Sequence, residues 1–189
     1  MERVALFRGI NVGGHRKVSM AELRTALVEA GFDSVTTYIQ SGNAVISGGP
    51  ADDEATEALL GYVLLDRFGL DDVGVIVLAR QRLEHARAIS AQAFPLGDAD
   101  PAEHAKRVHI VFLADLPSPT RRASLHPDEF APDRFILDLH DGDAELHVAY
   151  AVGAGSSALT TARIERAFGV RATGRNLNTV DRLLELMES

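Results

Sequence analysis

Hydrophobic positions along the first half of the chain alternate between two spacings, and this alternation predicts a fold. Short apolar or β-branched runs bounded by turn residues are typical of strands. They occur at residues 4–7, 35–40, 43–47 and 73–79. Apolar side chains three or four positions apart are typical of helices, and residues 20–27 and 55–63 show this spacing. We therefore expect the order strand, helix, strand, strand, helix, strand.

The second half repeats this order after a helix at residues 81–91 and a linker rich in Pro, Gly and Asp at residues 95–101. Strands are expected at residues 107–113, 134–140, 143–150 and 170–173, and helices at residues 119–129, 157–168 and 180–187. Asp141-Gly142 predicts a tight hairpin between two of these strands. Its register places apolar residues opposite one another, for example Phe135 opposite Val148.

A β-α-β-β-α-β order with right-handed crossovers is the ferredoxin-like plait. We expect an α+β fold of two tandem ferredoxin-like plaits with additional helices. Residues 1–80 would form the first subdomain, residues 81–103 a bridging helix and linker, and residues 104–189 the second subdomain with a C-terminal helix. Residues 4–7 and 75–78 are apolar throughout, so both faces of these strands should be covered, which predicts a cleft between the halves.

Composition excludes several classes of protein. The chain has 189 residues, of which 46% are hydrophobic and 24% charged, as in an average globular protein. The absence of cysteine excludes disulfides, thiolate zinc sites and cysteine nucleophiles. With no long uncharged apolar run and no signal-peptide pattern, the protein should be cytoplasmic and should not enter a membrane. A net charge of −8 argues against wholesale nucleic-acid binding and leaves local binding open.

The turn after the first strand is the first candidate for chemistry. Three glycines between Arg8 and Lys17 allow a sharp turn with N–H groups aimed at a ligand, and the helix after Ser19 adds its positive end. The segment is not a P-loop, because His15 stands where the lysine should be and no Ser or Thr follows it. The spacing of the glycines excludes a dinucleotide fingerprint. The residues expected to bind an anion are Arg8, Gly9, Asn11, Gly13, Gly14, Arg16 and Lys17. The alternative is a strand-to-helix loop that needs glycines only for its backbone.

Two further segments could complete such a site, and their polar residues are Gln40, Ser41, Asn43, Arg175, Asn176 and Asn178. The first segment falls in a predicted hairpin, where Ser, Gly and Asn are also favoured for backbone reasons. The second precedes the last helix, where either asparagine could be a simple N-cap. An arginine with two amides at a helix start also suits a carboxylate, a phosphate or a base edge.

Charged residues form two basic islands in an acidic chain. Residues 1–24 and residues 160–182 each hold five basic and two acidic residues. The islands could converge on one anionic ligand, or they could be solvated faces. Asp138, His140, Asp143 and His147 resemble metal ligands in the sequence, but the two-residue period of a strand already explains their spacing. We expect neither a metal nor a cofactor.

Four strings of residues carry a family resemblance. They are LFRGINVGGHRKV at residues 6–18, MAEL at residues 20–23, YIQSGN at residues 38–43, and Arg175-Asn176 with Asn178-Thr179. Together they resemble the bacterial family called domain of unknown function 1697. The resemblance implies two ferredoxin-like subdomains and supplies no established reaction.

This chain departs from the family pattern mainly in its second half. Ser19 stands where the family usually has proline, and Gly174 and Leu177 stand where it usually has Thr and Trp. Ser156 and Ala158 occupy positions that are typically basic. If those family residues contact a ligand, this chain binds it differently or has lost it, so the N-terminal motifs carry more weight.

Three functions remain open from the sequence. The leading one is binding of a small anionic or nucleotide-like ligand in a cleft lined by the glycine-rich loop. The second is an enzyme acting on a phosphorylated or acyl substrate there, which needs a general base such as His15. The third is a non-catalytic interaction module, marked by an exposed apolar patch. A monomer or a weak dimer is expected.

Overall fold

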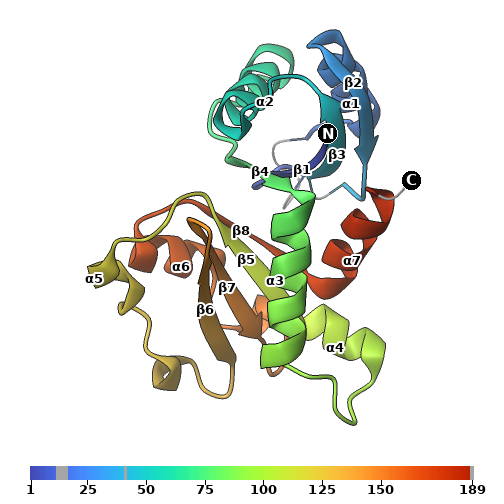
Figure 1. Cartoon of the computed structure of the whole chain (residues 1–189). Helices are drawn as coiled ribbons and strands as arrows, with labels where there is room; N and C mark the ends of the chain where they lie inside the picture. Colours follow the sequence, from blue (N-terminus) through green and yellow to red (C-terminus); the bar gives the residue numbers. More distant parts are fainter. Residues whose placement is uncertain (12–16, 41, 188–189) are drawn as a thin grey trace. The chain divides into compact units, whose positions relative to one another are not determined.

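The computed structural model describes residues 1–11, 17–40 and 42–187, and it confirms an α+β fold with two four-stranded antiparallel sheets (Figure 1). The chain divides into two compact units, Met1–Leu83 with the residues from Leu183 onward, and Glu84–Arg182. The division falls inside helices α3 (Arg80–Ala93) and α7 (Leu177–Leu186). None of the described helices is both long and apolar enough to cross a membrane.

The first unit has the predicted order of elements. They are β1 (Glu2–Phe7), α1 (Met20–Glu29), β2 (Phe32–Thr37), β3 (Asn43–Gly48), α2 (Asp53–Phe68) and β4 (Val75–Ala79), with strand order β2-β3-β1-β4. Local signals explain the helix ends. The Ser19 hydroxyl accepts from the Glu22 N–H at 3.4 Å, and the Asp52 carboxylate accepts from the Ala55 N–H at 2.8 Å. Strand β2 ends before residue 40, as Ile39 has a φ of 49° that a strand cannot contain.

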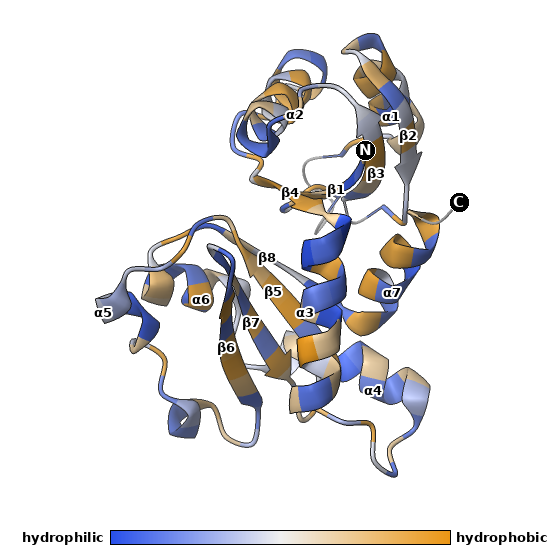
Figure 2. Ribbon diagram, viewed as in Figure 1, coloured by the Kyte–Doolittle hydropathy of each residue, from blue (hydrophilic) through white to orange (hydrophobic). Residues whose placement is uncertain are grey.

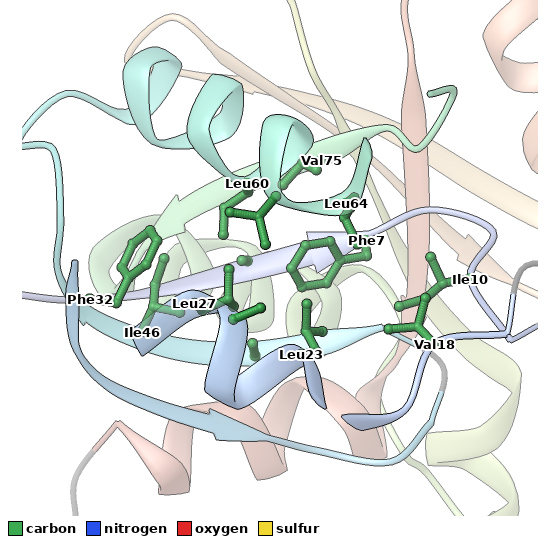
Figure 3. Close-up of a cluster of buried hydrophobic side chains, with 14 of the residues drawn as sticks. Phe7, Ile10, Val18, Leu23, Leu27, Phe32, Ile46, Leu60, Leu64 and Val75 are labelled. Carbon is green, nitrogen blue, oxygen red and sulfur yellow. The ribbon is translucent and has the colours of Figure 1, made fainter. Parts of the chain in front are cut away.

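One face of this sheet packs against α1 and α2. Phe7, Leu23, Leu27, Leu60 and Leu64 fill the space between the sheet and the two helices, and all are almost fully buried (Figure 3). Burying each such side chain contributes about 1.5–3 kcal/mol. The core therefore fixes the ends of the strands from which the loops start.

Arg3 is a structural residue of the first unit. Its guanidinium donates to the Asp53 carboxylate at 3.1 Å, to the Thr56 hydroxyl at 2.9 Å and to the carbonyls of Gly48 and Pro50 at 2.9 and 2.7 Å. The residue is only 6% exposed. Arg3 thus joins β1 to the start of α2. Although Arg3 belongs to the basic island of residues 1–24, its charge is already balanced by Asp53.

The second unit repeats the strand pattern. Its strands are β5 (Val108–Leu113), β6 (Arg134–His140), β7 (Asp143–Ala149) and β8 (Ala172–Asn176), in the order β6-β7-β5-β8. The predicted hairpin register is confirmed, since Phe135 lies opposite Val148. Asp141 and Gly142 both have positive φ, 51° and 89°, as a tight hairpin turn requires. Strands β4 and β5 are hydrophobic along most of their length (Figure 2).

The helices of the second unit differ from the prediction. The helix expected at residues 119–129 is instead α5 (Pro119–Arg122) followed by a 3₁₀ turn (Pro127–Phe130). Proline disfavours helical backbone in the residue before it, and His126 is accordingly extended. Helix α6 (Thr161–Phe168) starts later than expected because Thr160 caps it. The short helix α4 (Pro101–Arg107), which begins at the end of the predicted linker, was not expected.

We expect Gly42→Ala to destabilise the first unit. The φ of Gly42 is 86°, and a Cβ there would lie 2.8 Å from the Phe7 carbonyl oxygen. The loss in free energy of unfolding should be about 2 kcal/mol or more. The matched control is Gly61→Ala within α2, where a Cβ meets nothing within 4 Å. Gly61→Ala should raise the free energy of unfolding by about 1 kcal/mol, because alanine favours the helix more than glycine does. Urea denaturation compares the two variants, and similar effects of both would contradict this account.

Candidate functional site

The chain leaves β1 between the starts of its two neighbouring strands. The Phe7 N–H donates to the Gly42 carbonyl at 2.8 Å, immediately before β3. The Arg8 N–H donates to the Gly74 carbonyl at 2.8 Å, immediately before β4. Gly9 then turns the chain with a φ of 76°. The segments containing Arg8 and Gly42 therefore meet at one end of the first sheet.

Asn11 fastens the loop that follows. Its side-chain N–H groups donate to the carbonyls of Val18 and Gln40, both at 2.9 Å, and its side-chain oxygen accepts from the Val18 N–H at 2.8 Å. Asn11 has a φ of 56°, which asparagine adopts more readily than most residues. We call these three hydrogen bonds the Asn11 anchor. The anchor joins residue 11 to residue 18 and both to the segment before β3. The side-chain amide of Asn11 is therefore engaged in hydrogen bonds within the protein, and Asn11 positions the ends of the loop.

Two apolar side chains reinforce the anchor. Ile10 and Val18 are 0% and 4% exposed and belong to the first unit's core cluster. They lie at the same end of that core, beyond Phe7 and Leu23 (Figure 3). The residues on either side of the anchor are therefore held by burial as well as by hydrogen bonds.

The basic side chains of this region lie outside the core. Arg8 is half-buried, and its aliphatic stem runs along Gly74. A Cβ added to Gly74 would lie 3.6 Å from the Cβ and 3.7 Å from the Cδ of Arg8. Lys17 is exposed and lies two positions before Ser19, the N-cap of α1. The positive end of a helix and a lysine therefore adjoin the anchored loop.

The remaining predicted residues of the first unit have different positions. Gln40 is exposed, and its carbonyl receives the Asn11 amide at 2.9 Å. Asn43 is 1% exposed and donates to the Tyr38 carbonyl at 3.2 Å, so it stabilises the segment before β3. The predictions at Gly13, Gly14, Arg16 and Ser41, together with His15, lie outside the described residues.

Arg175, Asn176 and Asn178 belong to the second unit. The Asn176 side-chain oxygen accepts from the N–H and the hydroxyl of Thr179, at 3.0 and 2.9 Å, and so caps α7. Arg175 donates to the Thr173 hydroxyl at 2.7 Å and the Gly174 carbonyl at 2.8 Å. Burial lowers the pKa of Arg175 to about 10, which leaves it charged at neutral pH. Asn178 is exposed.

A polar cluster on the second sheet was missed by the sequence interpretation. His147 of β7 is fully buried, and its Nδ1 lies 2.7 Å from the Ser90 hydroxyl of α3. His85, also on α3, lies 2.8 Å from the Asp138 carboxylate and stacks on His140 at 3.9 Å. The predicted polar face of the hairpin is therefore covered by α3 here. The alternation of the strand showed which residues share this face, but nothing in the sequence showed that a helix covers it.

Burial lowers the pKa of His147 to about 4, and the neighbouring His85 acts in the same direction while Asp138 opposes it. The Nε2 atom of His147 has no hydrogen-bond partner among the described residues. His147 is thus held neutral. Within the described part of the chain, no group of three or more His, Asp or Glu residues could hold a metal ion.

The comparisons with other proteins identify the family. A family model described as a protein of unknown function, DUF1697, matches residues 1–141. The chain belongs to this family. A solved structure of a conserved bacterial protein from Streptococcus pneumoniae is 21% identical, with a TM-score of 0.69, and the match covers 100% of this chain and 98% of that one. This likeness shows a shared fold. Among curated proteins, none matches the chain.

The DUF1697 match covers the anchored loop and the segment before β3. It ends before Arg175, Asn176 and Asn178, in the region where this chain departs from the family pattern. The match also covers residues 84–141 of the second unit.

We expect Asn11→Ala to loosen the loop and lower the free energy of unfolding by about 2–4 kcal/mol, because it removes three hydrogen bonds. Asn11→Asp keeps the oxygen that accepts from Val18 and loses the two N–H donors. Its carboxylate would lie against the carbonyl oxygens of Val18 and Gln40, so this variant should be destabilised as well. The control is Asn178→Ala, at an exposed position, with an expected change within about 0.5 kcal/mol. Urea denaturation of the three variants decides, and an Asn11→Ala protein as stable as the control would disprove the anchor.

Acidification should destabilise the protein through His147. Its pKa of about 4 in the folded state lies below the unfolded value of about 6.5, so the unfolded chain binds the proton more readily. This histidine leaves stability unaffected above pH ~6.5 and lowers it by up to about 3 kcal/mol as the pH falls to ~4. Urea denaturation at several pH values should show a shallower dependence for His147→Gln than for the unmodified protein or His126→Gln. Identical slopes would refute the assignment.

Proposed function

We propose that the loop between β1 and α1 binds a small anionic or nucleotide-like ligand. The observation that carries this proposal is the Asn11 anchor, which fixes both ends of a glycine-rich loop beside the N-terminus of a helix. A loop whose two ends are held in place loses less conformational entropy on binding a ligand than a loop whose ends are free. The family match over the same residues supports the choice of this region.

The charges at this end of the sheet favour an anion. Lys17 is exposed, and Arg8 leaves the end of β1 with its stem on Gly74. Helix α1 is ten residues long, and its first N–H groups carry a partial positive charge. Arg3 does not contribute, because its guanidinium is committed to Asp53 and Thr56. Arg8 and Lys17 would therefore hold the negative charge, while the exposed Gln40 side chain would contact polar groups of the ligand.

A thermal-shift screen tests the proposal, with inorganic phosphate, pyrophosphate, nucleotides and short RNA as probes. A ligand at a hundred times its dissociation constant should stabilise the protein by about 2.7 kcal/mol, which raises the melting temperature by several degrees. Arg8→Ala and Lys17→Ala should each reduce the shift. Arg24→Ala, at an exposed residue whose guanidinium contacts Thr37 at 2.6 Å, is the matched control. A shift that survives both Arg8→Ala and Lys17→Ala would count against the proposal.

A second candidate function, a non-catalytic interaction module, is favoured by one observation on α2. Tyr62 and Leu65 are 62% and 49% exposed on the outer side of that helix, although it already buries Leu60 and Leu64 inward. Exposed apolar residues on a helix that already has a buried face suit contact with another protein. No thermal shift across the panel, together with concentration-dependent self-association in sedimentation, would favour this module over ligand binding.

A further inference from the structure

A pocket of about 590 Å³ lies within the second unit. It is formed by the segment after α3, by α4, and by residues at the start of β6 and the end of β7. Its lining includes Phe94, His104, Arg107, Val108, Arg134 and Tyr150. The volume is in the range of sites for small organic ligands. We call it the Phe94 pocket.

Buried apolar groups form the base of the Phe94 pocket. Phe94, Val108 and Tyr150 are 4%, 2% and 5% exposed. The Tyr150 hydroxyl donates to the Leu159 carbonyl at 3.1 Å, and burial raises the pKa of Tyr150 to about 12. Its polar atom is therefore satisfied and stays protonated. The base consequently suits the apolar part of a ligand.

Basic groups with spare donors surround this base. The Arg134 guanidinium lies 5.4 Å from the centre of the Phe94 ring and has no hydrogen-bond or ion-pair partner among the described residues. A guanidinium stacked on a ring keeps its edge N–H groups free to bind a carboxylate in the plane. The imidazole of His104 likewise has no polar partner in the described part of the chain. Arg107 donates to the Ala151 carbonyl at 3.0 Å and retains further donors.

The acids that line the pocket are already engaged. The Asp100 carboxylate accepts from the Glu103 N–H at 3.0 Å and so caps α4. The Glu103 carboxylate accepts from Lys106 at 2.7 Å and lies 4.0 Å from Arg107. The negative charges of Asp100 and Glu103 equal in number the positive charges of Arg107 and Arg134, so the formal charge of the pocket lining is zero. One negative charge on a ligand can be matched by the free guanidinium edge, whereas a second would face Asp100 and Glu103.

We propose that the Phe94 pocket binds a small organic monocarboxylate, with its carboxylate on Arg134 and its apolar body against Phe94 and Val108. The site belongs to the second unit and is independent of the anion proposed for the loop after β1. A planar carboxylate matches the fork of a guanidinium, and the buried ring gives an apolar body its contact area.

Benzoate is the probe for this proposal, titrated into the ¹⁵N-labelled full chain and followed by amide chemical shifts. Saturable shifts should appear at Phe94, Tyr150 and Ala151, with a dissociation constant in the range of about 1 mM or below. Acetate, which lacks an apolar body, should bind more weakly than benzoate, and so should inorganic phosphate. Absence of saturable shifts at these residues, or equal affinity for acetate or phosphate, would overturn the proposal.

Arg134→Gln removes the proposed carboxylate partner at an exposed position, so it should not impair folding. Benzoate affinity should fall by about 10- to 100-fold, as expected for loss of a charged hydrogen-bond pair. Arg171→Gln is the control, because Arg171 is exposed in the same unit and does not line the pocket. Unchanged affinity in Arg134→Gln, or an equal loss in Arg171→Gln, would reject the assigned role of Arg134.

Discussion

The chain leaves β1 between two neighbouring strands, and the hydrogen bonds that it makes there set the position of the candidate site. Strand β1 is central in its sheet and buried on both faces, so every polar backbone group at its end must find a partner. The N–H groups of Phe7 and Arg8 meet the carbonyls of Gly42 and Gly74. The Asn11 anchor then satisfies the N–H and the carbonyl of Val18. The loop that follows β1 is consequently attached at both ends.

In each unit, a glutamate side chain also supplies a partner for a backbone N–H. The Glu57 carboxylate of α2 accepts from the Val77 N–H of β4 at 2.8 Å. The Glu165 carboxylate of α6 accepts from the Ala172 N–H of β8 at 2.9 Å. Both strands lie at an edge of their sheet, where unpaired N–H groups would invite pairing with another chain. A glutamate on the preceding helix thus pairs one N–H of the edge strand in each unit.

Features that depend on neighbouring residues could be predicted from the sequence. Spacing of apolar residues predicted the order of elements, Asp141-Gly142 predicted the hairpin and its register, and Ser19 predicted the start of α1. The helix at residues 119–129 was predicted wrongly, because Pro127 keeps His126 extended and so divides the segment.

Features that depend on residues far apart in the chain could not be predicted. The side chain of Asn11 had been expected to face a ligand, yet it donates to the Gln40 carbonyl. No pattern among neighbouring residues predicts that contact. His85 and Asp138, and Ser90 and His147, meet only because α3 lies over the second sheet. The Phe94 pocket joins the segment after α3 to the start of β6, and these are also far apart in the sequence. Each of these follows from tertiary packing.

Hydrogen exchange at the Val18 amide of the unmodified protein tests the central claim most directly. The Val18 N–H donates to the side chain of Asn11 at 2.8 Å, and Val18 is 4% exposed. An anchored loop predicts that this amide exchanges slowly, with protection approaching that of the strand amides in β1. Exchange near the rate of an unfolded peptide would show that the loop is not attached at this point, and would contradict the account of the site.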